Sequence, residues 1–412
     1  MPGLPDMPTA AIVTVGSELL DGIGLDTNTR EIAEELTRSG YRVMEASSVP
    51  DDPALLASAL RRLTGAYSLV VCTGGLGPTH DDVTREAASA ALGLPLSEDP
   101  ALRALLEPVA ARHARAEAHG QVFSQALVLE GAQVISATSG TAPGQIVPTR
   151  GGTLALLPGP PHEMRPMLDA VLDCERRSPV RILGCVGISE SDAQVAAQRV
   201  LAGSRDIDLT VLATPGHVRV VLVSRGAEEA HLEDMAHRIA NAIGDRCYTV
   251  DGEDLAAAVL SLALRRGVQL ALAESCTGGL VASRITEVPG SSAAFAGAVV
   301  AYSNRAKADL LEVAEDTLSA HGAVSAEVAE QMARGACARF GADLAVSVTG
   351  VAGPDGGSAD KPVGLVWFGI AGLGQTVSVR RNLYGDRHGI RERASVTALD
   401  LLRRRLAGLE VD

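Results

Sequence analysis

At 412 residues the chain is long enough for two or three domains, and it can bury substantial cores without disulfides or structural metals. Apolar residues make up 46% of it and aromatic residues only 2%, so those cores must be aliphatic. Its net charge of −14 disfavours nonspecific binding to nucleic acid or anionic membranes, and no stretch is apolar enough for long enough to cross a bilayer.

The first part of the chain alternates strand and helix patterns. A candidate helix begins at Asn28, which is followed by Glu31 at the spacing of a helix cap, and it ends at Gly40. Strands separated by short helices are typical of βαβ units, so we expect a doubly wound, mostly parallel sheet. Ligands bind such sheets at the carboxyl ends of the strands, where the glycine-rich run 74–77 lies here. The predicted strands are 11–15, 41–46, 68–73 and 152–157, and the further helices are 53–63 and one from about residue 82.

The segment 180–250 has a different rhythm, with the order βαββαβ that is typical of a small α+β sandwich. Pro215 and Gly216 are expected to turn the hairpin between its central strands. The run from Gly184 to Gly187 matches the G-x-x-G loop of RNA-binding KH domains. With 43 glycines in the chain such a match is expected by chance, and no basic residues flank it. The predicted strands are 181–186, 209–213, 218–223 and 247–250, and the helices are 191–201 and 228–243.

The last segment is predicted to be a second layered α/β structure. A turn at 274–279 leads from a strand into a helix, and a long arginine-rich helix ends the chain. A glycine-rich loop covers 350–364. The predicted strands are 268–273, 298–302, 344–349, 365–371 and 376–381, and the helices are 255–265, 304–311 and 325–339.

Ser275 lies where a buried strand is predicted to turn into a helix. This placement is similar to that of a nucleophile elbow, which exposes a hydroxyl at the edge of a sheet. The backbone N–H groups of Thr277, Gly278 and Gly279 would point at the same spot and could bind an oxyanion or a phosphate. The alternative is that Ser275 only caps the following helix.

A serine nucleophile needs a base, and Lys307 is the best candidate. Lys307 and Lys361 are the chain's only lysines among 36 basic residues. Arginine cannot lose its proton at working pH, so a position that retains lysine is a candidate for a deprotonable amine. We expect the neighbouring Arg305 and partial burial to lower the pKa of Lys307. Chance retention is the alternative, and Lys361, beside Asp360 in a loop, is more typical of a surface charge.

Two arginines open the last helix. Arg387 and Arg391 lie on its first turn, where a cation is unfavourable against the helix dipole, so one of them is expected to bind an anionic ligand such as phosphate. Arg393 is as well explained by a solvated helix face. The histidines of this segment, His321 and His388, lie beside no plausible orienting acid.

Several long motifs resemble the CinA family, in the family's domain order and over essentially the whole chain. The C-terminal runs AESCTGGL, TEVPGSSAAFAGAVVAYSNRAK, HGAVSAEVAEQMA and SVTGVAGPDGGSADKPVG are similar to the nicotinamide mononucleotide deamidase module. The N-terminal runs VGSELLDG, DTN, CTGGLGPTHDDVTREA, SGTAPGQ and LPGPPHEM resemble its molybdopterin-binding-like domain. The resemblance implies domains at 8–175, 176–251 and 252–410, the second being a KH-type connector.

For the C-terminal domain the resemblance implies hydrolysis of nicotinamide mononucleotide to nicotinate mononucleotide and ammonia, without a cofactor. Its serine–lysine pair matches Ser275 and Lys307, and Arg391 is the residue expected to bind the phosphate. The expected substrate contacts are Glu274, Thr277, Gly278, Gly279, Tyr302, Asn304, Thr349, Gly350, Gly353 and Arg391.

For the N-terminal domain the resemblance implies hydrolysis of ADP-ribose to AMP and ribose 5-phosphate with a divalent metal (Mg, Mn or Co) and, in some members, potassium. Asp82 and Glu18 are the expected metal ligands, although Asp81 or Asp82 could instead cap a helix. The family usually has Asn and Lys before Gln125, where this chain has Phe123 and Ser124, so the resemblance does not carry a ligand contact over to that strand. The expected substrate contacts are Glu18, Asn28, Thr73, Gly74, Gly75, Gly77, Asp81, Gly140, Thr141, Gly144, Pro158, Gly159 and Pro160.

The hypothesis is therefore a bifunctional hydrolase of pyridine-nucleotide salvage. Scattered cysteines without zinc spacing, and an N-terminus without a basic segment, predict a cytoplasmic protein, which we expect to be a homodimer without membrane or nucleic-acid partners. One alternative is a molybdopterin- or nucleotide-binding scaffold with only the C-terminal activity. Another, suggested by the family name, is a DNA-uptake accessory, which the acidic charge and scarce aromatics disfavour.

Overall fold

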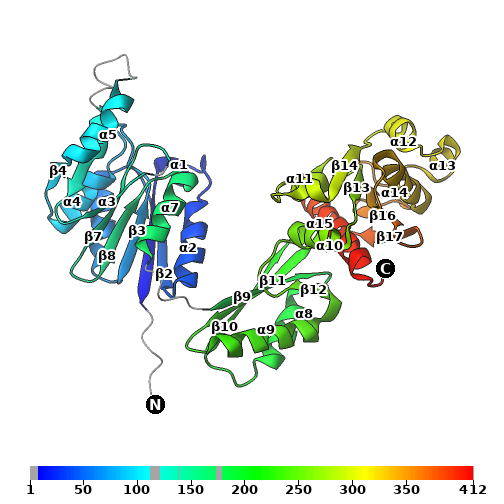
Figure 1. Cartoon of the computed structure of the whole chain (residues 1–412), viewed down its shortest axis with the longest axis horizontal. Helices are drawn as coiled ribbons and strands as arrows, with labels where there is room; N and C mark the ends of the chain where they lie inside the picture. The colour runs from blue at the N-terminus through cyan, green and yellow to red at the C-terminus, as the bar shows by residue number, and fades with distance from the viewer. Residues whose placement is uncertain (1–7, 112–120, 138, 173–178, 412) are drawn as a thin grey trace. The chain divides into compact units, whose positions relative to one another are not determined.

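The computed structural model describes residues 8–111, 121–137, 139–172 and 179–411. The chain forms two compact units, Met1–Pro179 and Val180–Asp412 (Figure 1). The predicted domain boundary at 175/176 and Cys174 lie outside the described residues. The sheets of the predicted second and third domains both belong to the second unit, and the boundary drawn between them at 251/252 stays a prediction.

The N-terminal unit is built on a six-stranded sheet with the order β2-β1-β3-β8-β7-β6. The first four strands in this order are parallel, which confirms the predicted doubly wound class, and β7 and β6 add an antiparallel edge that was not predicted. The strands are β1 (Thr9–Val15), β2 (Arg42–Val49), β3 (Leu69–Thr73), β8 (Thr153–Leu157), β7 (Gly144–Pro148) and β6 (Gln133–Ile135).

Helices cover both faces of this sheet (Figure 1). Neighbouring residues of β1 point to opposite faces: Ile12 packs with α2 and α7, whereas Val13 packs with α3 and α4. Asp52 caps α3 by accepting from two N–H groups at 2.9 Å. The helices are α1 (Ser17–Leu20), α2 (Asn28–Arg38), α3 (Pro53–Thr64), α4 (Thr84–Leu92), α5 (Pro100–Ala110) and α7 (Pro161–Val171), with a 3₁₀ turn η1 (Phe123–Ala126) and the short strands β4 (Leu96–Glu98) and β5 (Leu127–Leu129).

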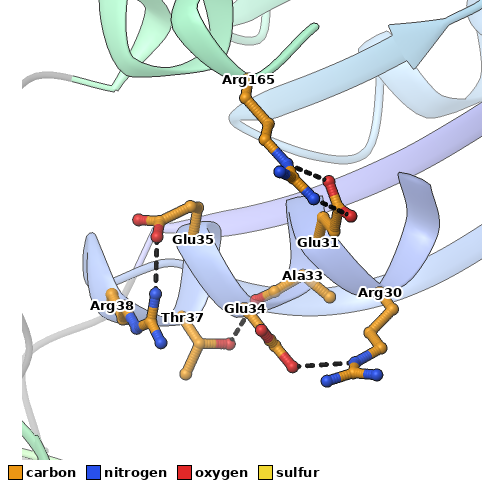
Figure 2. A network of polar contacts seen from close by, with 8 residues as sticks. All are labelled: Arg30, Glu31, Ala33, Glu34, Glu35, Thr37, Arg38 and Arg165. Atoms are coloured by element: carbon orange, nitrogen blue, oxygen red, sulfur yellow. Dashed lines mark hydrogen bonds and ion pairs between the residues drawn. The ribbon is translucent and has the colours of Figure 1, made fainter. Parts of the chain in front are cut away.

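The predicted cap at Asn28 is wrong. The carboxylate of Asp26 accepts instead from Thr29, at 2.9 Å from the backbone N–H and 2.6 Å from the hydroxyl. Glu31, expected as the other half of the cap, pairs with Arg165 of α7 at 2.6 Å, as Figure 2 shows. The side chain of Asn28 is therefore available for a contact across the sheet.

The second unit contains a four-stranded antiparallel sheet with the order β10-β11-β9-β12. Its chain order confirms the predicted βαββαβ pattern, and Pro215 and Gly216 form the hairpin turn, with φ +84° at the glycine. The G-x-x-G run is not a loop between helices, because Gly184 lies inside β9 and pairs with β11 and β12. The elements are β9 (Val180–Val186), α8 (Glu190–Val200), β10 (Ile207–Thr214), β11 (His217–Ser224), α9 (Glu229–Ile243), η2 (Gly244–Arg246) and β12 (Cys247–Thr249).

The same unit contains a five-stranded sheet with the order β14-β13-β15-β16-β17. Strands β14, β13 and β15 are parallel, β16 and β17 are antiparallel, and separate apolar clusters cover the two faces. The strands are β13 (Leu270–Glu274), β14 (Phe295–Val300), β15 (Leu344–Gly350), β16 (Leu365–Gly372) and β17 (Val377–Asn382).

Helices α10, α11 and α15 pack on one face of this sheet, and α12, α13 and α14 contribute to the apolar cluster on the other. Helix α13 was not predicted. No helix in the described part of the chain is both long and apolar enough to span a membrane. The bounds are α10 (Leu255–Arg266), α11 (Leu280–Thr286), η3 (Ser291–Ala293), α12 (Asn304–Leu311), α13 (Glu315–His321), α14 (Ala326–Phe340) and α15 (Arg387–Ala407).

Candidate functional site

Ser275 follows β13 directly, at the carboxyl end of a central parallel strand. Its backbone N–H donates to Val348 O of the neighbouring β15 at 2.9 Å, which fixes the residue at the sheet edge. The chain then turns through Gly278 and Gly279, with φ of +62° and +93°, a region that favours glycine. Gly279, not Ser275, is the N-cap residue of α11, so the capping alternative for Ser275 is wrong.

Lys307, on α12, reaches Ser275 from the other side of the strand end. Its Nζ atom donates to Ser275 Oγ at 3.0 Å and to Ala301 O at 2.8 Å. The side chain of Lys307 is 1% exposed and has no carboxylate partner among the residues that the structure describes. Burial therefore lowers the pKa of Lys307, with Cys276 opposing the shift.

Of the two causes expected for that lowered pKa, burial is confirmed and the charge of Arg305 does not contribute. Arg305 is solvent-exposed and pairs with Asp309 at 3.1 Å, which offsets its charge. The pKa of Lys307 is lowered by desolvation. The site therefore contains an amine that loses its proton more easily than an exposed lysine does.

Glu274 serves the backbone. Its buried carboxylate accepts from the N–H groups of Gly279 at 3.0 Å, Val281 at 3.2 Å and Ala282 at 2.9 Å. These are the donors at the start of α11, so Glu274, the last residue of β13, binds the N-terminus of the helix that follows it. Glu274 therefore holds the serine loop, and its expected role as a substrate contact stays a prediction.

Glu274 also decides which backbone donors remain at the serine. Gly279 N–H is bound by Glu274, and Gly278 N–H donates to Ser275 O at 3.1 Å. The N–H groups of Cys276 and Thr277 donate to no other residue in the described part of the chain. The Oγ1 atom of Thr277 is buried without a partner as well. The predicted donor set 277–279 therefore shifts to 276–277.

The two arginines at the start of α15 have different partners. Arg391, half-buried, donates from Nη2 to Thr277 O at 2.7 Å and so supports the serine loop. Arg387 is exposed and donates to Gly353 O at 2.7 Å and to Tyr302 OH at 3.1 Å. Arg387, which was left out of the expected substrate contacts, therefore joins the glycine-rich loop to the exposed Tyr302.

The remaining expected contacts of this site differ in availability. Thr349 is buried, and its hydroxyl donates to Ala323 O at 2.7 Å. Asn304 is exposed at the first residue of α12, and Gly350 packs tightly against β16. Lys361 donates to His321 O at 2.6 Å, so it binds the carbonyl end of α13 and is not a free surface charge.

In the N-terminal unit, Asn28 brings together three expected site residues. Its Nδ2 atom donates to Thr73 Oγ1 at 3.2 Å and to Gly159 O at 2.7 Å, and Thr73 donates to Pro158 O at 2.8 Å. The Oδ1 atom of Asn28 is buried without a partner. An unpaired buried acceptor at the carboxyl ends of β3 and β8 indicates a place where a ligand donor fits.

Gly74 and Gly75, in the run after β3, have no room for a Cβ atom. A Cβ atom at Gly74 would lie 2.4 Å from Val15 O, and one at Gly75 would lie 2.4 Å from Thr84 Oγ1. Thr84, at the start of α4, donates to Gly74 O at 2.8 Å, which holds the run against that helix. The buried Arg85 donates to Leu76 O at 2.7 Å, and burial lowers its pKa to about 10.

Asp82 shapes this loop, and neither of its oxygens is left free. Oδ1 accepts from Gly77 N–H at 2.7 Å, and Oδ2 accepts from Thr79, at 2.7 Å from N–H and 2.5 Å from the hydroxyl. Asp81 is exposed, and a hydrogen bond from Thr79 lowers its pKa. The helix-capping alternative does not hold, since Val83 is the N-cap residue of α4 and no side chain caps that helix.

The two expected metal ligands, Glu18 and Asp82, differ in their surroundings. Glu18 is exposed and folds over Gly16, where a Cβ atom would lie 2.5 Å from its Oε1. No group of three His, Cys, Asp or Glu side chains within the described ranges is arranged to hold a metal ion. The expected pair of ligands, Glu18 and Asp82, stays a prediction; both oxygens of Asp82 accept hydrogen bonds from Gly77 and Thr79.

The second loop of this site includes a residue that the sequence reasoning missed. Gly140 has φ +74°, and a Cβ atom there would lie 2.3 Å from the carboxylate of Glu163, at the start of α7. Gly144 packs against Met167, which explains this glycine without a ligand. Thr141 is half-buried and Pro160 is exposed. Only proximity to Gly140 reveals Glu163, because its sequence neighbours indicate an ordinary helix start.

Two family models match the chain: the CinA C-terminal domain at residues 252–406 and a probable molybdopterin binding domain at residues 11–177. A putative competence-damage inducible protein of Symbiobacterium thermophilum is 42% identical, over 97% of this chain and 99% of its own. A CinA-like protein of Thermotoga maritima is 38% identical, over 98% and 100%. The competence/damage inducible protein CihA of Agrobacterium tumefaciens is 44% identical, covering 36% of this chain and 91% of its own with a TM-score of 0.35.

Proposed function

Because this chain belongs to the CinA family, we propose that its C-terminal site hydrolyses the carboxamide of nicotinamide mononucleotide. The observation that supports this proposal is the 3.0 Å contact between Lys307 Nζ and Ser275 Oγ at a buried strand end. A hydroxyl next to an easily deprotonated amine is the arrangement needed to attack an unreactive carbonyl. The substrate is proposed from the family resemblance, and the reaction type from the residues.

In the proposed reaction, neutral Lys307 takes the proton of Ser275 as Oγ attacks the amide carbon. The tetrahedral oxyanion accepts hydrogen bonds from the free N–H groups of Cys276 and Thr277. Lys307 then returns the proton to the nitrogen, the C–N bond breaks and ammonia leaves. Water, deprotonated by the same lysine, attacks the resulting ester, which releases nicotinate mononucleotide and restores Ser275.

Lys307 can both take and return a proton because its surroundings favour the neutral amine. The Nζ atom keeps one acceptor, Ala301 O at 2.8 Å, which orients it toward Ser275 whether or not it carries the extra proton. None of the described carboxylates forms an ion pair with Lys307, and burial lowers its pKa. A lysine with an acidic partner would stay protonated and be a poor base.

The substrate phosphate needs a cation at the rim of the site. Arg391 was the first choice, but its contact with Thr277 O makes it a support of the oxyanion loop. We propose Arg387 for the phosphate, because it is exposed and lies beside Tyr302 and Gly353. Tyr302 and Asn304, both exposed at the start of α12, are proposed to border the nucleotide.

Ammonia release from nicotinamide mononucleotide tests this function directly. We expect release by the wild-type chain and none above background by Ser275→Ala. A covalent acyl adduct on Ser275, trapped by acid quench and located by mass spectrometry, is expected during turnover. Full activity of Ser275→Ala would remove the proposal.

For the N-terminal unit we propose binding of ADP-ribose at the ends of β3 and β8. The observation in its favour is the unpaired Oδ1 atom of Asn28, beside Thr73 and Gly159. Cleavage to AMP and ribose 5-phosphate with a divalent cation stays a prediction from the family resemblance, and no step is assigned here to a metal. Binding without cleavage, with or without Mg²⁺, Mn²⁺ or Co²⁺, would favour the alternative of a nucleotide-binding scaffold.

A further inference from the structure

Two cysteines face each other across neighbouring strands of the four-stranded sheet. Cys185 on β9 and Cys247 on β12 are partners in an antiparallel pairing whose register shifts between Cys247 and Thr249. Directly opposed residues in such ladders have Cα atoms about 4.5 or 5.5 Å apart, depending on the type of pair. A disulfide needs roughly 4.4 to 6.8 Å between Cα atoms, so both types of pair satisfy it.

The two side chains lie on the same face of the sheet. Cys185 is fully buried in the apolar cluster formed with α8 and α9, and Cys247 packs against that cluster while remaining partly exposed. Both are free thiols. Opposed residues on one face have Cβ atoms about 4.5–5.5 Å apart, so a small approach of β12, a short outer strand, joins the sulfurs.

The surroundings give the two thiols different reactivities. A hydrogen bond between them lowers the pKa of Cys247 and, together with burial, raises that of Cys185. Cys247 is also the more accessible of the two, and its Sγ atom donates to Thr249 O at 3.3 Å. A more acidic, more exposed thiol beside a buried one is the arrangement of an attacking and a resolving cysteine.

We propose that Cys185 and Cys247 form a dithiol modification site that reacts with a low-molecular-weight disulfide to give a disulfide between β9 and β12. The thiolate of Cys247 attacks the reagent RSSR, forming a mixed disulfide and releasing RS⁻. The thiolate of Cys185 then attacks the Cys247 sulfur, releasing a second thiolate. The two cysteines are oxidised by two electrons, and one RSSR is reduced to two thiols.

The proposed bond would fix β12, which contacts both the four-stranded sheet and the apolar cluster of the five-stranded sheet. The residue after Cys247, Tyr248, bonds His217 of β11 at 2.6 Å and packs against the apolar cluster of the five-stranded sheet. The loop closed by the bond contains α8, β10, β11 and α9, and a long closed loop restricts the unfolded chain strongly. Oxidation should therefore raise the melting temperature of the second unit, and a dithiol reagent should reverse it.

The test treats the folded full chain with 2-hydroxyethyl disulfide, alkylates the remaining thiols with N-ethylmaleimide and maps the peptides by mass spectrometry. We expect a Cys185–Cys247 linkage, loss of the thiols of these two residues and no retained hydroxyethylthiol group. Cys185→Ser should stop at the mixed disulfide on Cys247. Cys247→Ser should leave the Cys185 thiol unmodified.

Cys337 provides the matched control, because it is also partly exposed and has no cysteine partner among the described residues. Cys337→Ser should form the linkage at the wild-type rate. A stable mixed disulfide on Cys247 in the wild-type chain, or a linkage only after addition of urea, would overturn the proposal. Circular dichroism of each variant before treatment shows that the comparison is between folded proteins.

Discussion

Lys307 Nζ lies 3.0 Å from Ser275 Oγ, and this lysine is 1% exposed. Its second acceptor is the carbonyl of Ala301, at 2.8 Å, so both visible hydrogen bonds of the amine are to neutral oxygens. A buried ammonium with only neutral partners loses much of its hydration. The pair is therefore arranged to keep the amine neutral and pointed at the serine.

The first prediction concerns the identity of this base. Lys307→Arg should lose about 10²- to 10⁴-fold in kcat for ammonia release, the range that a general base contributes. A guanidinium keeps the positive charge but cannot take the serine proton. Lys361→Arg is the matched control, since Lys361 only binds the carbonyl end of α13. Comparable losses in the two variants would contradict a special role for Lys307.

The second prediction follows from the lowered pKa of Lys307. The base acts when it is neutral, so kcat/KM should rise with pH through that pKa and level off above it. Because the pKa is lowered, the plateau should be reached at a lower pH than an exposed lysine would give. The measurement is a pH profile of ammonia release with a folding check at each pH. A rise centred in the range of exposed lysines would mean that burial does not tune this amine.

Much of the fold could be predicted from the sequence, because apolar runs and turn residues act locally. The runs around Val13 and Leu272 predicted central strands, and both residues are fully buried. The short strands β4 to β7 were missed, since a three-residue strand such as Leu127–Leu129 carries too little periodicity to be recognised. Helix α5 lies between them and was missed with them.

The roles of site residues could be predicted where the residue type alone indicates the chemistry. The scarcity of lysine singled out Lys307 before any contact was known. The roles of Glu274 and Asp82 were not predictable, because both carboxylates bind backbone N–H groups of their own loops. Local spacing also misplaced the cap of α2, where Asp26 fits the N–H of Thr29 and leaves Asn28 for a tertiary contact.

The third prediction separates the two arginines. Arg387→Gln should raise KM for nicotinamide mononucleotide about tenfold or more, with little change for nicotinamide riboside, which lacks the phosphate. Arg391→Gln should instead lower kcat for both substrates by about tenfold to a hundredfold. The physical reason is the lost charge-assisted bond to Thr277 O, which holds the oxyanion donors. Steady-state kinetics on the two substrates decides, and the reverse pattern would return the phosphate to Arg391.

The fourth prediction concerns the buried carboxylate of Glu274. Glu274→Gln should lower the free energy of unfolding by about 2–3 kcal/mol, because an amide replaces one acceptor oxygen with donors that face N–H groups. Urea unfolding of the full chain, followed at the second unit, measures this loss. Glu287→Gln, an exposed residue at the other end of α11, should change little. Equal stability of the two variants would mean that the cap contributes nothing.

The last prediction tests the N-terminal site. Asn28→Asp should weaken ADP-ribose binding at least tenfold, because a carboxylate cannot donate to Gly159 O or Thr73 Oγ1 and would repel the ligand's phosphates. Asn241→Asp, an exposed change of the same charge in the other unit, should bind as the wild type does.

Titration calorimetry should be run with chelator and with Mg²⁺, Mn²⁺ or Co²⁺ while AMP release is followed. One outcome is that ADP-ribose binds in chelator while AMP is released only when a divalent cation is added. That result would mean that the substrate phosphates help to hold the metal, since the described side chains form no three-ligand group of their own. Undiminished binding by Asn28→Asp would mean that the ligand does not occupy the ends of β3 and β8.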